Sequence, residues 1–527
     1  MRVPYRALIF VVAFVALLTL HMPFIGLPYF WDEAGYYIPA AWDFYKGWDF
    51  IPTSTLPTGH TPLVMIYLAL TWHILGYSPF VTRVAMILIA SATVLASHAL
   101  ARRFMGREPA VWSALLLAIS PLFFAQSSLV FLDLPAALFT TLAVFALMSE
   151  RFLLFALGAS LAVLTKETAV VLLPVAWVYA SHRDRASRGA AGNAQEGRAA
   201  RRARQWLALV LPLAPLLAWT LYYHHKSGFW TGNAGYLEYN LYSTHDPSRI
   251  AWSVLRRLYE IFIGGFQWLV ALGAVAGYLW GLKIRHGRPT TQKPAAHLHG
   301  VASGLIVVYV VMLSVVGGAV LPRYLLPIYP VFFLGCVILI WQLPRAAGRA
   351  ICVTAAVCFV AAWFINPPYP FAFENNLAYA DFIRLHQDAA RYLESRQPER
   401  RILTAWPATD EVSRPFLGYV ARPFRVVPVE GFTERDFEKI EPESFDVLYL
   451  YSRKWEPSNN WLQRFPALLR AQQTHFGYAP QILDSILVQR FGLTLEAQFE
   501  RRGQWVRVYG RREAIGSSQA ADRPASR

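Results

Sequence analysis

Long apolar segments recur along the first two thirds of the chain and are separated by short polar segments. The first apolar segment spans residues 7–27, and similar segments continue to residue 366, where an ordinary soluble composition begins. A transmembrane helix needs about 20 mostly apolar residues. The pattern therefore predicts a polytopic α-helical membrane domain over residues 1–366. A terminal domain, residues 367–512, and a disordered tail, residues 513–527, are expected to follow.

The apolar segments predict about 11 transmembrane helices. In chain order the expected spans are 7–27, 80–100, 109–126, 131–149, 152–165, 168–180, 205–223, 257–282, 300–320, 324–343 and 349–365. The fifth and sixth are short for full spans. They could be short helices that meet at the outer face, or a pair that is broken within the membrane.

The placement of positive charge predicts the orientation of these helices. The formal net charge is +16, and the Arg and Lys residues cluster in short loops between apolar segments. Such loops face the cytoplasm. With Arg2 and Arg6 inside, every basic loop falls on the cytoplasmic side, and no nucleic-acid groove is indicated. The terminal domain is therefore expected outside the cytoplasm.

The long loop 28–79 falls on the outer side in this arrangement. Within it, residues 34–45 carry aromatic side chains at helical spacing and predict an amphipathic helix in the membrane interface. Residues 62–75 are apolar but short for a span, so this segment is expected to pack along the membrane face.

The terminal domain has the alternation of a small α/β domain. Helices are expected at 379–395, 410–419 and 460–473, and strands at 401–405, 425–429, 446–451, 493–499 and 505–509. No glycine-rich phosphate loop opens any of these helices, so a nucleotide site is not predicted.

Neither a disulfide nor a dedicated metal site is predicted. The three cysteines, Cys336, Cys352 and Cys358, all lie in apolar segments. No histidine or acidic spacing is typical of a metal site, and His224 and His225 are interpreted as a solvated helix end. No cofactor is assigned, and a divalent cation is left open.

Four motifs carry the candidate chemistry. They are the pair Asp32-Glu33 after the first span, Gly59-His60-Thr61-Pro62-Leu63, Leu132-Asp133-Leu134-Pro135, and the run from Pro322 to Pro330 that contains Arg323 and Tyr324. With the predicted topology, they resemble the GT-C type of integral-membrane glycosyltransferases. Most similar are bacterial relatives of the protein O-mannosyltransferases and of the lipid A aminoarabinose transferase, over most of residues 1–366.

The resemblance implies a polyprenyl-phosphate sugar as donor and transfer on the outer face of the membrane. Such a displacement needs a base for the acceptor hydroxyl and cationic or hydrogen-bonding groups for the departing phosphate. The resemblance assigns Asp32 as the base, with Glu33 as its support or as an acceptor contact. Asp133 is expected to orient the acceptor or the sugar. The alternatives are a solvated helix flank for the pair and a helix cap for Asp133.

The phosphate is expected to meet groups on the outer side. Arg323 lies at an outer helix boundary where the charge bias would not place it. Tyr324 could donate a hydrogen bond or anchor the chain in the aromatic belt. Lys166 could pair with Glu167 or with phosphate. His60 could also donate, although the family often has a second proline where this chain has Thr61.

Several alternatives stay open at this level. The acceptor could be a protein hydroxyl, a lipid glycan or an envelope polysaccharide, and the sugar is not identified. A transporter or flippase is the alternative function, but only one candidate broken helix, near Lys166, occurs, without a mate in the second half. A scaffold without activity, which binds partners through the terminal domain, is a third hypothesis.

Overall fold

The computed structural model describes residues 5–188, 196–232, 246–285, 293–316, 319–366, 373–396, 399–453, 464–467, 470, 474 and 481–511. The chain divides into two compact units. The first contains Met1–Asn366 and Phe373–Ala380, and the second contains Pro367–Ala372 and Asp381–Arg527. The segment Phe373–Ala380 thus belongs with the helices that precede it.

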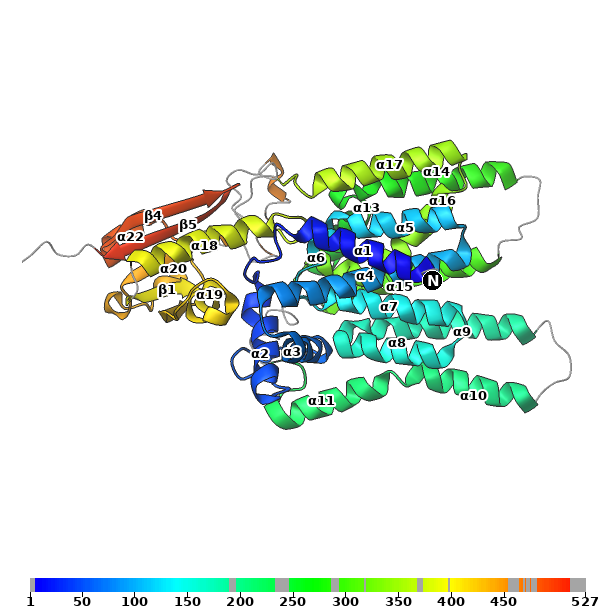
Figure 1. Ribbon diagram of the computed structural model, residues 1–527, viewed down its shortest axis with the longest axis horizontal. Helices are drawn as coiled ribbons and strands as arrows, with labels where there is room; N and C mark the ends of the chain where they lie inside the picture. Colours follow the sequence, from blue (N-terminus) through cyan, green and yellow to red (C-terminus); the bar gives the residue numbers. More distant parts are fainter. Residues whose placement is uncertain are drawn as a thin grey trace, which may run out of the picture. The chain divides into compact units, whose positions relative to one another are not determined.

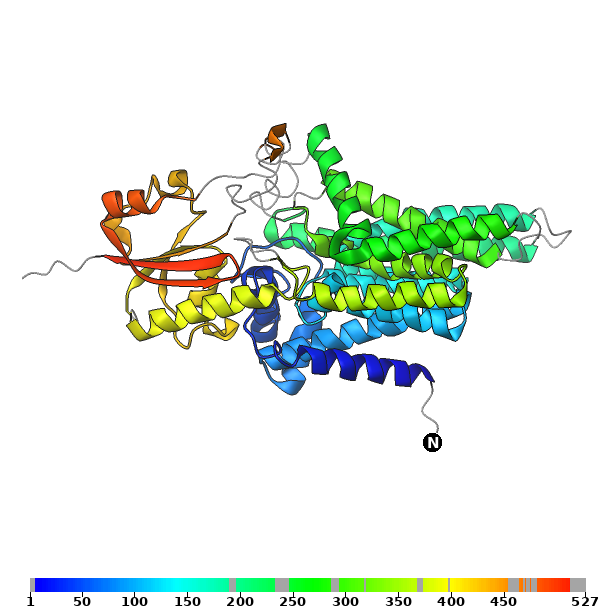
Figure 2. The same cartoon turned by 90° about the horizontal axis from the view of Figure 1, so that it is seen from above.

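The first unit is a helical bundle (Figures 1 and 2). Its helices are α1 (Tyr5–His21), α2 (Ile38–Gly47), α3 (Leu63–Leu75), α4 (Pro79–Phe104), α5 (Arg107–Ile119), α6 (Pro121–Gln126), α7 (Asp133–Met148), α8 (Phe152–Thr165), α9 (Leu172–Arg188), α10 (Glu196–Val210), α11 (Leu213–Ser227), α13 (Pro247–Phe262), α14 (Gln267–Arg285), α15 (Lys293–Val316), α16 (Tyr329–Ile340) and α17 (Arg345–Ala362). Short π or 3-10 turns cover Glu33–Tyr37, Glu167–Val171, Gly264–Phe266 and Pro322–Ile328.

The protein is a multi-pass membrane protein. Among the described residues, six helical segments are long and apolar enough to cross a membrane: Pro79–Phe104, Arg202–Ser227, Gly264–Ile284, His297–Val316, Pro322–Ile340 and Arg345–Ala362. Four shorter apolar helices, α1, α3, α7 and α8, accompany them. A total of about 11 spans stays a prediction.

The expected span 257–282 is wrong as a single helix. Helix α13 ends at Phe262, and α14 begins only at Gln267. Between them Gly265 and Phe266 have φ angles of +57° and +66°, in the left-handed region that interrupts a right-handed helix. The interruption separates an amphipathic helix, α13, from the apolar helix α14.

Two ion pairs join ends of helices in the first unit. Arg349 at the start of α17 pairs with Glu108 at the start of α5, with Nη2 and Oε2 3.0 Å apart. Arg183 near the end of α9 pairs with Glu150, which follows α7. The N-terminal end of α1 lies at the same end of the bundle (Figures 1 and 2). Asp133 begins α7 and therefore lies at the opposite end of that helix.

The second unit contains a five-stranded sheet in the order β2-β1-β3-β5-β4. The strands are β1 (Arg401–Ala405), β2 (Arg425–Val429), β3 (Val447–Tyr451), β4 (Leu493–Arg501) and β5 (Gln504–Arg511). Strand β1 is parallel to β2 and β3, whereas β5 is antiparallel to β3 and β4. The helices of this unit include α18 (Tyr379–Arg396), α19 (Ala408–Ser413), α20 (Glu434–Phe437) and α22 (Asp484–Phe491).

The strands of the second unit lie close to their expected positions, but the second of its three expected helices is displaced. The expected helix 410–419 begins and ends earlier, as α19, because the chain turns at Pro415. The expected helix 460–473 lies largely outside the described residues, and the tail 513–527 lies wholly outside them.

Helices α14 and α16 pack so closely that one position requires glycine. A Cβ atom at Gly277 would lie 2.0 Å from the carbonyl oxygen of Leu339, a backbone atom that cannot rotate away. We expect Gly277→Ala to destabilise the first unit by about 1–3 kcal/mol and to lower its melting temperature in detergent.

The matched control is Gly300→Ala in α15, where a Cβ atom meets nothing within 4 Å. Alanine favours a helix over glycine by about 1 kcal/mol, so this variant should melt at the same or a higher temperature. Equal melting of the two variants would contradict the packing argument.

Candidate functional site

Arg323 lies at the centre of the site and is surrounded by carboxylates. Its two terminal nitrogens donate hydrogen bonds to Asp32 Oδ2 and Glu374 Oε2, and its Nε lies 3.5 Å from Asp133 Oδ2. Only 1% of the Arg323 side chain is exposed. A buried charge is tolerated when it is paired. Arg323 therefore joins acidic residues from three separate segments of the chain.

Lys166 supplies a second buried cation to this cluster. Its Nζ lies 2.6 Å from Asp133 Oδ1 and 3.9 Å from the centroid of the Tyr324 ring. Asp133 thus lies between Lys166 and Arg323. Lys166 therefore pairs with Asp133 and not with Glu167. Its expected pairing with a phosphate stays a prediction.

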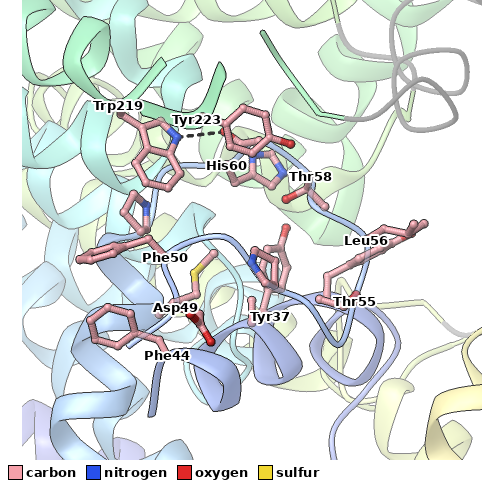
Figure 3. Close-up of a pocket in the computed structure, with 16 residues that line it drawn as sticks. Tyr37, Phe44, Asp49, Phe50, Thr55, Leu56, Thr58, His60, Trp219 and Tyr223 are labelled. Carbon is pink, nitrogen blue, oxygen red and sulfur yellow. Dashed lines mark hydrogen bonds between the residues drawn. The ribbon is translucent and has the colours of Figure 1, made fainter. Parts of the chain in front are cut away.

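His60 pairs with Glu167, outside the carboxylates around Arg323. Its Nδ1 lies 3.1 Å from both oxygens of Glu167, and its ring centroid lies 6.3 Å from that of Tyr37. His60 and Tyr37 also line a pocket between the loop after α2 and helix α11 (Figure 3). His60 therefore lies between this pocket and the segment that carries Lys166.

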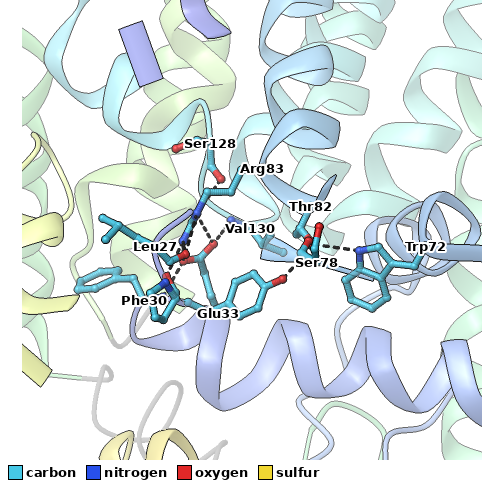
Figure 4. A network of polar contacts seen from close by, with 11 residues as sticks. Leu27, Phe30, Glu33, Trp72, Ser78, Thr82, Arg83, Ser128 and Val130 are labelled. Atoms are coloured by element: carbon cyan, nitrogen blue, oxygen red, sulfur yellow. Dashed lines mark hydrogen bonds and ion pairs between the residues drawn. The ribbon is translucent and has the colours of Figure 1, made fainter. Parts of the chain in front are cut away.

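Glu33 points into a different network from its neighbour Asp32. The Glu33 carboxylate accepts hydrogen bonds from the backbone amides of Phe30, at 2.7 Å, and Val130, at 2.6 Å. Arg83 Nη1 lies 3.2 Å from it, and both side chains are fully buried (Figure 4). Arg83 also donates to the carbonyls of Leu27, Pro28 and Ser128. The network fixes the segment before Asp32 against the segment before Asp133.

The contacts of Glu33 are those of a positioning residue. Its side chain has no exposed surface, so it offers none to an acceptor in this state. Its expected role as support for Asp32 stays a prediction. The sequence indicated the Asp-Glu pair but gave no sign that the two side chains face opposite networks.

Two contributors to the site were not predicted from the sequence. Glu374 follows the last apolar helix in a segment without a recognisable motif. Arg257 lies on α13, and its Nη2 donates to the Leu313 carbonyl at 2.9 Å. Its Nε and Nη1 have no hydrogen-bond partner within the part of the chain that the structure describes, although the residue is fully buried.

Arg257 belongs to a polar stripe that a helical pattern could have revealed. Arg249, Ser253 and Arg257 are spaced by four residues, which places them on one face of α13, and all three are buried. The expected span 257–282 divided this stripe and concealed it. Helix α13 contacts the turn Pro322–Ile328, which carries Arg323 and Tyr324, so the stripe reaches the surroundings of Arg323.

No metal cluster occurs among the described residues. There, no group of three or more His, Cys, Asp or Glu side chains is arranged to hold a metal ion. The carboxylates of Asp32, Asp133 and Glu374 are directed at Arg323 instead. A requirement for a divalent cation stays untested by this arrangement.

Comparison with known proteins gives one family match. A model of the family described as Dolichyl-phosphate-mannose-protein mannosyltransferase matches residues 59–189, which include His60, Asp133 and Lys166. No curated protein matches the chain.

Two solved structures of ArnT from Cupriavidus metallidurans share the fold. The apo structure superposes with a TM-score of 0.57 at 14% identity, over 95% of this chain and 98% of that one. The structure bound to undecaprenyl phosphate has a TM-score of 0.54 at 14% identity, over 94% and 97%. The similarity extends over nearly the whole of both chains.

At the site itself, the first prediction separates the two adjacent acids. Glu33→Gln should lower the unfolding free energy by about 3 kcal/mol, because Arg83 keeps its buried charge and loses its counter-charge. Asp32→Asn should have a smaller effect, since Arg323 retains Asp133 and Glu374. Melting temperatures of the purified variants in detergent measure both effects. A Glu33→Gln variant that melts like the parent would contradict the structural role.

The second prediction concerns pH. Burial raises the pKa of Glu374 to about 7, although Arg323 acts to lower it. The folded state therefore keeps a proton that the unfolded chain releases near its ordinary value of 4.5. Stability should fall as the pH rises from about 4.5 to about 7, and change little from this group above that range.

Glu374→Gln should remove this part of the pH dependence. Melting temperatures of parent and variant, measured between about pH 5 and pH 8, provide the test. If the melting temperatures of parent and variant change with pH in the same way, Glu374 does not hold the proton.

Proposed function

We propose that this chain, which has the fold of the GT-C type membrane glycosyltransferases, transfers a sugar from a polyprenyl-phosphate donor to an acceptor hydroxyl. The transfer would take place on the extracytoplasmic face of a bacterial plasma membrane. The observation that carries the proposal is the arrangement of Asp32, Asp133 and Glu374 around Arg323. The family match and the ArnT structure bound to undecaprenyl phosphate support the class of donor.

Asp32 is the base in this proposal. Among the three acids that meet Arg323, its side chain is the most exposed, at 16%, against 9% for Glu374 and 1% for Asp133. A base must reach the acceptor proton directly or through one water. Arg323 fixes the orientation of Asp32 from the buried side, and Asp133 keeps Arg323 and Lys166 in place.

The proposed reaction is a single inverting displacement. The acceptor oxygen attacks C1 of the sugar and forms the new glycosidic bond, while the bond from C1 to the phosphate oxygen breaks. The acceptor proton passes to the Asp32 carboxylate. The polyprenyl phosphate leaves with the electron pair of the broken bond, so its oxygens gain negative charge that nearby cations stabilise.

The cation for the leaving phosphate is better sought at Arg257 than at Arg323. Arg323 already meets three carboxylates, so a phosphate would have to compete with them. Arg257 has two buried nitrogens without partners among the described residues. Tyr324 contacts Lys166 and lies near Arg257. We therefore assign the phosphate to Arg257, Lys166 and Tyr324, and give Arg323 the task of orienting carboxylates.

This assignment favours a transferase over a transporter. A transporter needs no base and no stabilised leaving group. The cluster around Arg323 supplies an accessible carboxylate beside buried cations, which are the groups that a displacement at C1 requires.

The third prediction tests the base. Asp32→Asn should reduce sugar transfer from a polyprenyl-phosphate sugar by at least about a hundredfold, within the usual range for a general base. Donor binding should change little. Transfer is followed by thin-layer chromatography of radiolabelled donor with membrane acceptors. Near-normal transfer by a folded Asp32→Asn protein would overturn the assignment.

The fourth prediction tests the phosphate site. Arg257→Gln should weaken the binding of undecaprenyl phosphate about tenfold or more, because it removes the charge that faces the anion. Arg256→Gln is the matched control, since Arg256 is the preceding residue on α13 and its side chain is exposed. Binding is measured by native mass spectrometry or by thermal shift. Equal losses in both variants would contradict a specific site at Arg257.

A further inference from the structure

A pocket on the first unit has no role in the transfer step described above. It is a hollow open to solvent between residues 36–65 and helix α11, with a volume of about 480 Å³ when the solvent space at its mouth is included. Figure 3 shows the rings of Tyr37, Phe44, Phe50 and Trp219 arranged around a central space.

The rings of this pocket are held in fixed positions. Trp219 Nε1 donates to the Gly59 carbonyl at 3.2 Å, and the Tyr223 hydroxyl donates to the Pro57 carbonyl at 3.0 Å. Gly59 has a φ angle of +76°, and a Cβ atom there would lie 2.4 Å from the backbone nitrogen of Gly232. The loop and α11 are therefore closely fitted, and the aromatic wall is preorganised for a ligand.

The lining suits a sugar ring. The C–H face of a pyranose or furanose is apolar and stacks on an aromatic face, whereas its edge of hydroxyls needs hydrogen-bonding groups. Aromatic faces dominate the pocket, and Asp49, Thr55 and Thr58 supply oxygen atoms around it. A prenyl chain would need no such oxygens.

The charges of the lining disfavour an anionic ligand. Asp49 contributes a carboxylate, and His60 is the one basic residue among those that line the pocket. His60 already faces Glu167 at 3.1 Å. A phosphate or uronic acid carboxylate would therefore meet Asp49 without a dedicated cation, whereas a neutral sugar would not suffer that repulsion.

The pocket adjoins the reaction centre through its own residues. Tyr37 lines the pocket and meets the Phe131 ring edge-on, with centroids 5.9 Å apart. Phe131 in turn lies under the Arg323 guanidinium, 4.0 Å from its central carbon. The phosphate groups assigned above lie instead on α13 and on the segments that carry Lys166 and Tyr324. A ligand in the pocket thus approaches from the side of η1 (Glu33–Tyr37) and α2.

We propose that this pocket binds an uncharged sugar ring of the acceptor, so that the enzyme glycosylates a glycan rather than an amino-acid side chain or a phosphate. The inference rests on the proposed function for its reaction. The acceptor sugar stacks on Trp219 and Phe50, and one of its hydroxyls reaches toward Asp32. The donor sugar could offer the same ring chemistry, so the experiment separates the two sources.

The test measures sugar binding and donor turnover in parallel on the full chain in nanodiscs. Saturation-transfer NMR uses methyl glycosides of neutral hexoses and pentoses as probes, with glucuronate and a hexose phosphate as anionic comparisons. The variants are Trp219→Leu, which removes the ring, and Trp219→Phe, which keeps a ring and loses the bond to Gly59. Trp268→Leu on α14 is the matched control, because Trp268 is 41% exposed and does not line the pocket.

A neutral glycoside should give a signal that falls about tenfold in Trp219→Leu and is largely kept in Trp219→Phe and Trp268→Leu. The anionic probes should give none. Hydrolysis of a polyprenyl-phosphate sugar without acceptor should stay near the parent rate in Trp219→Leu, whereas transfer to membrane glycans should fall.

Three outcomes would overturn the inference. They are the absence of any glycoside signal, an equal signal in the parent and Trp219→Leu, and a loss of donor hydrolysis that parallels the loss of glycoside binding. The last would place the donor sugar in the pocket. If neutral glycosides bind as expected but no variant or parent uses the lipid-linked donor, the proposed function fails while the sugar pocket stands.

Discussion

The burial of one guanidinium organises this end of the bundle. Arg323 has almost no exposed surface, so its charge must be balanced by groups within the protein. The balance comes from Asp32 after the first helix, Asp133 at the start of α7 and Glu374 beyond the last helix. A bundle assembled from separate apolar helices thereby acquires a fixed polar centre. Packing of apolar helices in a membrane would not by itself select this arrangement.

The sequence was most informative where a single physical rule acts. Apolar length predicted the helices, because a bilayer permits few alternatives, and the strands of the second unit followed from their alternation. The motifs indicated Asp32, Asp133, Lys166 and Arg323, which the structure brings together. The sequence could not predict which carboxylate pairs with Lys166, because Lys166 lies beside Glu167 in the sequence but meets Asp133 in the structure.

What escaped prediction depends on packing between distant segments. Glu374 gains its place only because the chain returns to the first unit after residue 372. Arg257 was hidden because an apolar window extended across the break at Gly265. Once α13 is treated as a separate helix, its four-residue polar spacing is visible in the sequence. Only the structure shows that two nitrogens of the buried Arg257 have no partner among the described residues.

The opposite orientations of Asp32 and Glu33 have a consequence for how the chain tolerates change. Glu33 is tied to backbone amides on both sides, at Phe30 and Val130, while Asp32 meets Arg323. Insertion of a single residue between Leu27 and Asp32 would move the shorter aspartate into the place of Glu33, where it would fail to span to Val130. Deletion of a single residue would move the longer glutamate into the place of Asp32, where it would face Arg323. The number of residues between Leu27 and Asp32 is therefore constrained by the same two networks that constrain the identities of the two acids.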